Sequence, residues 1–151
     1  MEVERISKED LIKLAYLEKR AFEVGPYSIE MLEYALYEAG DMAFKIEDQG
    51  KIVAYLMAAP VSGASIDIES IAVDPDYRGK GLAKILFTFT EKLAREKGYK
   101  KIELEVREFN REAIGLYERL GFSKAEFLEN YYIEKYEGSR NAYRMEKDLG
   151  E

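Results

Sequence analysis

The sequence of 151 residues contains no cysteine, no histidine and no tryptophan. Without cysteine there can be no disulfide bond and no thiol nucleophile, and without both cysteine and histidine the usual zinc ligands are missing. The lack of histidine also excludes a Ser-His-Asp triad and removes the commonest base at neutral pH. We therefore expect no metal centre, and acid–base chemistry that uses carboxylates, tyrosine, lysine, backbone groups or water.

Long apolar runs and an excess of basic charge are missing as well. No apolar run approaches the roughly 18–20 residues of a membrane span, and the polar opening MEVERISKED lacks the apolar segment of a secretion signal. These features predict a cytoplasmic protein without membrane contact. The formal net charge of −7 argues against general binding of nucleic acid.

The composition that remains is typical of a globular protein. Apolar residues make up 47% and charged residues 35% of the chain, and we find no internal repeat, low-complexity tract or linker. A length of 151 residues is close to the commonest domain size. We therefore expect residues 1–151 to form a single domain.

Hydrophobic periodicity and turn residues predict the element order β-α-α-β-β-β-α-β-α-β-β. The expected strands are 3–6, 42–48, 51–60, 65–73, 100–108, 122–133 and 142–149, and the expected helices are 8–22, 29–39, 81–97 and 111–120. In the third helix, Leu82, Leu86, Phe89 and Leu93 are expected on one buried stripe. This order predicts an α+β fold with a central mixed sheet of about seven strands and four helices.

The fourth strand, SIDIESIAV, has an irregular pattern. Ile66 and Ile68 share one parity, whereas Ile71 and Val73 share the other. A slip between Glu69 and Ser70 is what an inserted bulge residue produces. A strand that is buried on both faces at one end explains the pattern equally well.

The segment DPDYRGKGLAK, residues 74–84, joins this strand to the third helix. Gly79 and Gly81 allow left-handed backbone angles and a close approach of a ligand. Arg78, Lys80 and Lys84 add positive charge at a helix N-terminus, which favours anions. The segment therefore predicts a phosphate cradle, the alternative being a flexible loop with solvated cations. It matches neither a nucleotide triphosphate loop nor a Rossmann fingerprint.

Four short motifs together resemble one family. RGKGLA at 78–83 fits the pattern [QR]-x-x-G-x-[GA], and NREAIGLYERLGF at 110–122 fits N-x-x-A-x-x-L-Y-x-x-x-G-F. With LEVR at 104–107 and NYY at 130–132, residues 66–148 resemble the GNAT superfamily of N-acetyltransferases. The last two motifs are similar to the RimI/Ard1 branch, which acetylates protein N-terminal α-amines.

The resemblance implies that acetyl-CoA is the co-substrate. Amides of residues 78–84 would hold its pyrophosphate, residues 71–73 would pair with its pantetheine arm, and the bulge would free an N–H to polarise the thioester carbonyl. Asn110 would contact the cofactor, although a helix N-cap alone explains an asparagine there. The implied cofactor-binding residues are Ile71, Ala72, Val73, Arg78, Gly79, Lys80, Gly81, Leu82, Ala83, Lys84 and Asn110.

The resemblance also implies two catalytic residues. Tyr117 would protonate the departing thiolate, but its neighbours on the helix stripe are also those of a core tyrosine. Glu105 would be the general base, with Glu69 and Glu103 in reserve. The alternation of Glu103, Glu105 and Arg107 fits a solvated salt-bridge row equally well.

The acceptor is expected between the 22–28 loop and the last two strands, where Glu23, Tyr27, Tyr131 and Tyr132 are the candidate contacts. An α-amine, with a pKa near 8, is easier to deprotonate than a lysine amine near 10.4. The resemblance to the RimI/Ard1 branch implies that a protein or peptide N-terminus is the partner, and this difference in pKa favours it over a lysine side chain. A polyamine or other small amine is one alternative, and a regulatory domain that binds acetyl-CoA without turnover is another. The sequence leaves a homodimer open.

Overall fold

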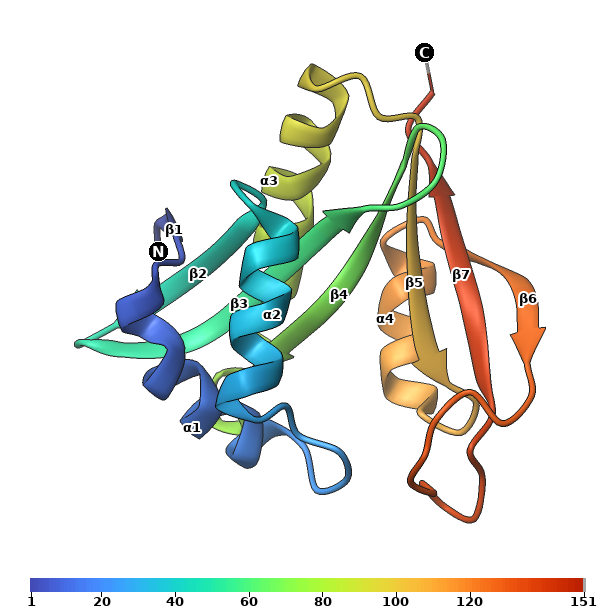
Figure 1. Cartoon of the computed structure of the whole chain (residues 1–151), viewed down its shortest axis with the longest axis horizontal. Coiled ribbons are helices and arrows are strands. Elements are labelled where there is room, and N and C mark those ends of the chain that lie inside the picture. The colour runs from blue at the N-terminus through green and yellow to red at the C-terminus, as the bar shows by residue number, and fades with distance from the viewer. Residues whose placement is uncertain (151) are drawn as a thin grey trace.

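The computed structural model describes residues 1–150 and contains one mixed sheet with the strand order β1-β2-β3-β4-β5-β7-β6 (Figure 1). The strands are β1 Val3–Arg5, β2 Ala43–Asp48, β3 Lys51–Pro60, β4 Ser65–Val73, β5 Lys101–Arg107, β6 Ser123–Leu128 and β7 Ala142–Asp148. The helices are α1 Leu11–Ala21, α2 Ile29–Ala39, α3 Leu82–Glu96 and α4 Arg111–Arg119, with the 3₁₀ turns η1 Lys8–Asp10 and η2 Pro75–Tyr77. The predicted fold class and element order are confirmed.

The helices cover the two faces of the sheet in pairs (Figure 1). On β3, alternate side chains enter opposite cores: Leu56 packs with α3 and α4, whereas Tyr55 and Met57 pack with α1 and α2. This alternation follows from the two-residue period of a strand. β3 is therefore buried on both faces, as its almost continuous apolar sequence suggests.

β4 has both of the properties that the sequence pattern allows: it contains a bulge, and its first four residues, Ser65 to Ile68, are buried on both faces of the sheet. Its register against β3 shifts so that Met57 pairs with Ser70 and Ala58 pairs with Ile68, which leaves Glu69 as the inserted residue. The predicted bulge is thus confirmed. On its other side, β4 runs parallel to β5 from Ser65 to Ile68, and beyond this point the two strands diverge (Figure 1).

Two details of the sequence prediction are wrong. The sixth strand ends at Leu128 instead of 133, because Asn130 adopts a left-handed backbone (φ 53°) and its N–H donates to the Asn141 side chain. Phe89 is 43% exposed, whereas Phe87 is fully buried. α3 buries the neighbouring stripe because this side of the helix faces Tyr117 and Phe122. Among residues 1–150, no helix is both long and apolar enough to cross a membrane.

Candidate active site

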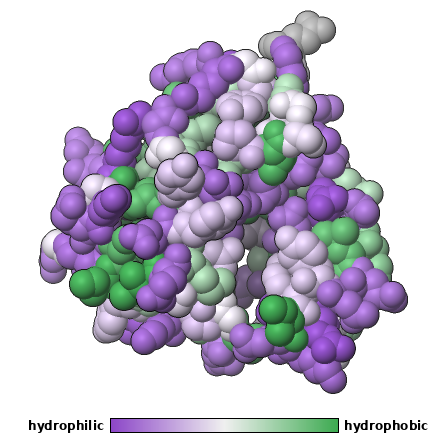
Figure 2. All heavy atoms as spheres, in the orientation of Figure 1, coloured by the Kyte–Doolittle hydropathy of each residue, from purple (hydrophilic) through white to green (hydrophobic). Residues whose placement is uncertain are grey.

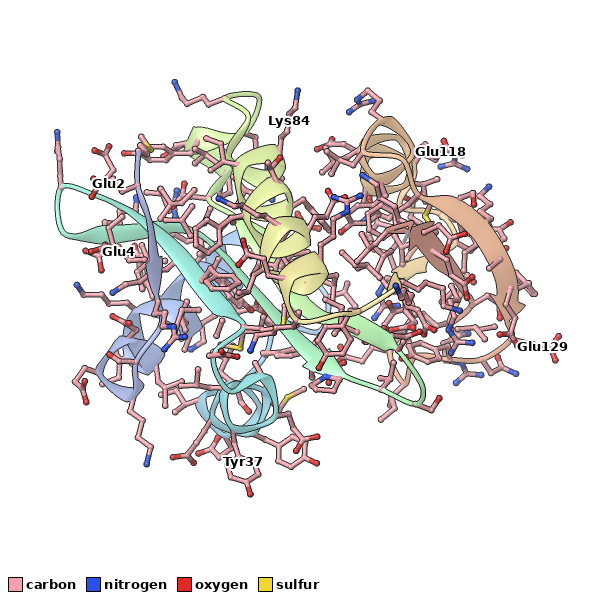
Figure 3. The ribbon with its side chains drawn as sticks, turned by 90° about the horizontal axis from the view of Figure 1, so that it is seen from above. Glu2, Glu4, Tyr37, Lys84, Glu118 and Glu129 are labelled. Atoms are coloured by element: carbon pink, nitrogen blue, oxygen red, sulfur yellow. The ribbon has the colours of Figure 1, made fainter. Side chains whose placement is uncertain are left out.

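The turn before α3 presents open backbone. Gly79 and Gly81 have φ values of 77° and 81°, and a Cβ added at either would meet no atom within 4 Å. The first amides of a helix lack intrahelical partners, so this turn can hold an anion such as a diphosphate. Lys80 and Lys84 are exposed beside it, and Lys84 projects from the surface (Figure 3). Leu82 and Ala83 are buried, so only their backbone is available to a ligand.

A buried ion pair fixes the start of this turn. Asp74, which follows β4 directly, is fully buried and accepts from Arg20 at 2.9 and 3.0 Å and from the N–H of Asp76 at 2.9 Å. The Arg20 guanidinium holds the pKa of Asp74 well below its usual range despite burial. Arg78 donates to the carbonyl of Ala21 at 3.1 Å, so its side chain ties the turn to α1.

The divergence of β4 and β5 leaves a backbone edge. Among residues 1–150, no strand pairs with the β5-facing edge of residues 69–73. Such an edge can pair with an extended ligand as an added strand would. Ala72 is buried here, whereas Ile71 and Val73 are half-buried. The edge leads directly into the turn at 78–81, so both parts of the predicted cofactor site are continuous.

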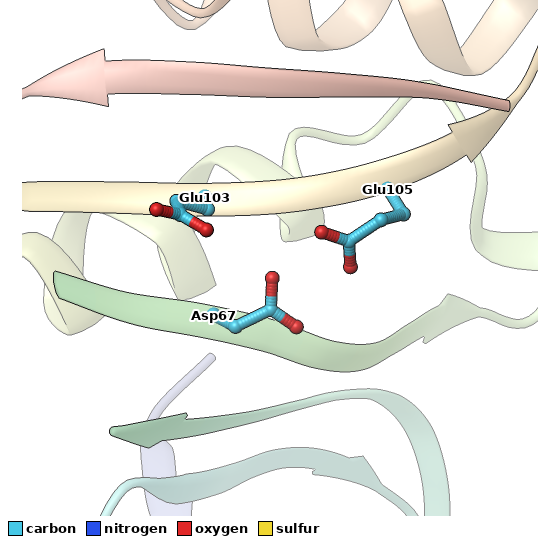
Figure 4. A group of neighbouring side chains, drawn as sticks. All are labelled: Asp67, Glu103 and Glu105. Atoms are coloured by element: carbon cyan, nitrogen blue, oxygen red, sulfur yellow. The ribbon is translucent and has the colours of Figure 1, made fainter. Parts of the chain in front are cut away.

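Glu105 lies one residue beyond the last β4–β5 pair, Ile68–Leu104. It is half-buried, and Arg144 Nε donates to its Oε2 at 3.3 Å. Carboxylate oxygens of Asp67, Glu103 and Glu105 lie within 4.8 Å of one another (Figure 4). Burial raises the pKa of Glu105, while hydrogen bonds with Asp67 and Arg144 oppose the rise. A raised pKa suits a carboxylate that must take a proton near neutral pH.

Tyr117 lies on the opposite face of the sheet, in the core beneath α3 and α4. Its ring meets Phe87 and Phe122 edge-on, with centroids 5.9 and 6.2 Å away, so the residue does pack in the core, and its catalytic role stays a prediction. Among residues 1–150, no hydrogen bond to its hydroxyl is found. Burial raises the pKa of Tyr117, so the hydroxyl keeps its proton at neutral pH and remains able to donate it.

Asn110 caps α4, because its side chain accepts from the N–H of Ala113 at 3.1 Å. Asn110 is therefore the N-cap of α4, and its contact with a cofactor stays a prediction. Because α4 begins just after β5, this cap also fixes the direction in which α4 leaves the site.

Two loops carry the residues that are expected to contact the acceptor. In the α1–α2 loop, Tyr27 is half-buried, and its hydroxyl donates to the carbonyl of Glu69 in the bulge at 2.9 Å. In the β6–β7 loop, the rings of Tyr131 and Tyr132 meet edge-on at 5.0 Å, and the Arg107 guanidinium lies 3.9 Å from the Tyr132 ring centroid. All three tyrosines have pKa values raised by burial.

Figure 2 shows a hollow in the surface between the part with α1 and α2 and the part with β5 and β7. Glu23 is exposed in the α1–α2 loop. Burial raises the pKa of Tyr136 in the β6–β7 loop, and the charges of Glu137 and Glu23 add to the rise. A pocket of about 360 Å³ also lies beside Tyr27, lined by Tyr27, Glu30, Met31, Tyr34, Ala35 and Glu69.

Sequence reasoning missed two buried acids near this site. Glu18 is 1% exposed and receives hydrogen bonds from the Tyr27 N–H at 2.7 Å and the Tyr55 hydroxyl at 2.6 Å, so it holds the loop in place. Asp67, the third residue of β4, is 6% exposed. Both gave a signal: Glu18 continues the apolar stripe of Leu11 and Leu14, and aspartate is rare inside strands.

Comparisons with known proteins agree with this arrangement. Escherichia coli N-acetyltransferase YjgM, uncharacterized, is 33% identical over 111 residues, which are 72% of this chain and 66% of YjgM. Escherichia coli [ribosomal protein bS18]-alanine N-acetyltransferase is 37% identical over 89 residues, 59% of this chain and 60% of that protein. The chain thus matches less than two thirds of the length of these curated relatives.

Solved structures extend the likeness over the whole chain. A crystal structure of the Escherichia coli S18-alanine N-acetyltransferase has a TM-score of 0.86 at 29% identity, covering 99% of this chain and 94% of that one. Ard1 from Thermoplasma volcanium has a TM-score of 0.89 at 25% identity, covering 99% and 98%. The model of the Acetyltransferase (GNAT) family matches residues 9–122. The chain belongs to the GNAT acetyltransferase family.

Proposed function

We propose that this protein transfers the acetyl group of acetyl-CoA to the N-terminal α-amine of proteins or peptides. One observation supports the proposal most directly: the unpaired edge of residues 69–73 connects the open turn at Gly79 and Gly81 with Glu105. A phosphate-binding turn at one end and a basic carboxylate at the other are what an acyl transfer from a long phosphorylated carrier requires.

The chain's own groups fit such a carrier. Amides of the turn and of the first turn of α3 would hold the diphosphate, with Lys80 and Lys84 adding charge. Backbone groups of Ile71 and Val73 would bind the extended arm as an added strand. Bound acetyl-CoA supplies an acetyl thioester, which an uncharged amine can attack. The fit depends on the open backbone at Gly79 and Gly81, where a side chain would occupy the space of the ligand.

Two residues would move protons. Glu105 would take the proton from the attacking amine, directly or through one water, as the new N–C bond forms. Tyr117 would give its proton to the sulfur as the C–S bond breaks. The two residues approach from opposite faces of the sheet, which is open at this point because β4 and β5 have separated. No covalent acetyl-enzyme is needed, and the chain has no cysteine to form one.

The relatives support an α-amine as the acceptor, because the Escherichia coli relative, similar in both sequence and structure, is named for alanine N-acetylation of a ribosomal protein. The acceptor would enter between Tyr27 on one side and Tyr131 and Tyr132 on the other, with Glu23 at the rim. The pocket beside Tyr27 could hold the side chain of an early acceptor residue. A cytoplasmic location, where acetyl-CoA and new N-termini occur together, is part of the proposal.

The test uses the purified protein, acetyl-CoA and a peptide panel read by mass spectrometry. The panel contains free N-termini with different first residues, the same peptides with blocked N-termini, peptides with internal lysines, and spermidine. We expect acetylation of free α-amines only. Modification of spermidine with all peptides untouched would replace the proposal by a small-amine acetyltransferase. Tight binding of acetyl-CoA without transfer to any acceptor would make the chain a regulatory domain.

A further inference from the structure

Asp67 is a buried acid that the proposed reaction does not use. It lies on β4, where it pairs in register with Glu103 of β5, and it is only 6% exposed. Figure 4 shows its side chain directed from β4 toward the Glu103 and Glu105 carboxylates. An acid in this position has two ionisable neighbours on the next strand and almost no water around it.

The cations of this region contact the β5 carboxylates and leave Asp67 without one. Arg144 Nε lies 3.3 Å from Glu105 and 3.8 Å from Glu103, and Lys101 lies 3.5 Å from Glu103. Among residues 1–150, Asp67 has no ion pair, and its Oδ1 is buried without a hydrogen-bond partner. An ionised carboxylate that is buried without a cation or a hydrogen-bond donor would cost free energy, so Asp67 must gain either a positively charged partner or a proton.

Besides Lys101, which contacts Glu103, the other ionisable groups around Asp67 disfavour its ionisation or contact other residues. They are Glu69 on its own strand, Glu103 and Glu105 on β5, Arg144 on β7, Tyr27 in the α1–α2 loop, and Tyr131 and Tyr132 in the β6–β7 loop. Three of these are further carboxylates, and the single arginine already contacts two of them. The balance of charge therefore favours a neutral Asp67.

We propose that Asp67 is a positioning residue that stays protonated and donates its carboxylic O–H to Glu105, which keeps Glu105 ionised and directed toward the acceptor amine. The inference rests on the proposed function, in which Glu105 is the base. Within the pair, one proton is shared and one negative charge remains. Glu105 thus gains a hydrogen bond that stabilises its charged form, although it lies in a half-buried place that disfavours charge.

The direction of both titrations agrees with this geometry. Burial, with further contributions from Glu69 and Glu105, raises the pKa of Asp67 to about 10. The hydrogen bond with Asp67 lowers the pKa of Glu105, against the rise that burial causes. Two carboxylic groups with the same chemistry are thereby given different roles, because their surroundings move their pKa values apart.

The first experiment reads Asp67 directly and needs no turnover. Carboxyl ¹³C chemical shifts of the intact protein are followed over pH by NMR, and the Asp67 signal is assigned as the one missing in Asp67→Asn. We expect Asp67 to remain protonated through neutral pH and to lose its proton only at alkaline pH. A titration in the ordinary range of aspartate, about pH 4, would overturn the proposal.

The second experiment compares the pH dependence of kcat/KM among variants. The acid limb of this profile is the pH range in which kcat/KM rises as Glu105 loses its proton. Asp67→Ala removes the hydrogen-bond donor, so the midpoint of the acid limb should move to higher pH by about one unit. At pH values below this midpoint, kcat/KM should fall about tenfold. Asp67→Asn keeps a donor of similar size, so its acid limb should stay at the wild-type pH. Glu69→Gln is the matched control, because loss of this neighbouring charge should move the limb to lower pH.

The outcomes separate this inference from the proposed function. If Asp67→Asn moves the limb downward as Glu69→Gln does, Asp67 is ionised and the inference fails. If millimolar Mg²⁺ or Mn²⁺ shifts or broadens the Asp67 and Glu103 signals, the cluster binds a cation instead, which also overturns it. If Glu105→Gln keeps full activity, the proposed base is wrong. In that case, the NMR titration still decides whether Asp67 holds the proton. If the acid limb lies at the same pH in Asp67→Ala, Asp67→Asn and the wild type, Asp67 has no positioning role.

Discussion

Two buried aspartates at opposite ends of β4 have opposite charge states. Asp67 is 6% exposed and Asp74 is fully buried, so burial alone would make both neutral. Asp74 forms ion pairs with Arg20 and Lys51 and accepts a hydrogen bond from a backbone N–H, and its pKa lies well below the usual range. Asp67 meets carboxylates, and its pKa rises to about 10. The partners, and not the depth of burial, decide which state a buried acid adopts.

The difference also separates two tasks within one strand. The ionised Asp74 joins α1 to the end of β4 and holds the turn at 78–81 in place. The neutral Asp67 lies beside the proposed base at the other end. We expect substitutions at the Asp74 end to change stability and substitutions at the Asp67 end to change turnover.

The largest effect is expected from Asp74→Asn. The substitution leaves Arg20 and Lys51 without their shared partner, and removing one member of a buried ion pair costs about 3 kcal/mol. Urea unfolding at neutral pH measures this loss. Asp76→Asn, which alters an exposed partner of the same arginine, is the control and should change the free energy of unfolding little. Equal stability of Asp74→Asn and the wild type would mean that Asp74 is not the anchor of the turn.

Glu105→Gln should have the second largest effect, and on activity alone. Without the carboxylate that accepts the amine proton, kcat/KM should fall about 100-fold. The free energy of unfolding should stay the same or rise, because one of several close negative charges is removed. Steady-state kinetics and urea unfolding of the same preparation give both values. A large loss of stability would mean that Glu105, like Asp74, stabilises the fold.

Tyr117→Phe tests whether the hydroxyl of a largely buried tyrosine, which makes no hydrogen bond among residues 1–150, is also functional. The hydroxyl has no hydrogen bond among residues 1–150, so its removal should leave unfolding unchanged. Loss of a general acid should lower kcat at least tenfold, while the affinity for CoA, measured by calorimetry, should remain. Unchanged turnover would leave Tyr117 with a packing role only.

The two aspartates should also respond to pH with opposite sign. The folded-state pKa of Asp74 is depressed, so its stabilisation is present above about pH 4 and is lost as the pH falls below that value. The folded-state pKa of Asp67 is raised, so its contribution is full below about pH 4 and is lost as the pH rises toward about 10. The destabilisation by Asp74→Asn should therefore shrink in acid, whereas Asp67→Asn should become increasingly stabilising toward alkaline pH. Urea unfolding at a series of pH values measures both trends, and parallel trends would contradict the assignment.

The smallest effect is expected from Tyr27→Phe. It removes the hydrogen bond to the carbonyl of Glu69, which joins the α1–α2 loop to the bulge, at a cost of about 1 kcal/mol. Thermal unfolding measures the change, and Tyr37→Phe on the exposed face of α2 is the control (Figure 3). A change in KM for the peptide without a change in kcat would link this bond to the acceptor.

Most of the fold could be predicted because it depends on local patterns. Asn110 begins α4 as expected, and Ser28 caps α2 in the same way, since a cap bonds within three residues of itself. The parity slip at Glu69 predicted the bulge, because the faces of a strand alternate strictly. The stripe of α3 could not be settled in this way, since two neighbouring stripes are both apolar, and only packing against Phe122 selects Phe87.

The candidate site divides along the same line. The sequence by itself determined the glycine turn at the start of α3, the alternation that directs Glu105 away from the α3–α4 core, and the exclusion of histidine and cysteine chemistry. Only the tertiary structure decided that Asp67 meets Glu105 and that Asp74 meets Arg20, 54 residues away in sequence. The charge state of a buried acid depends on groups brought near it by folding, and no local pattern contains that information.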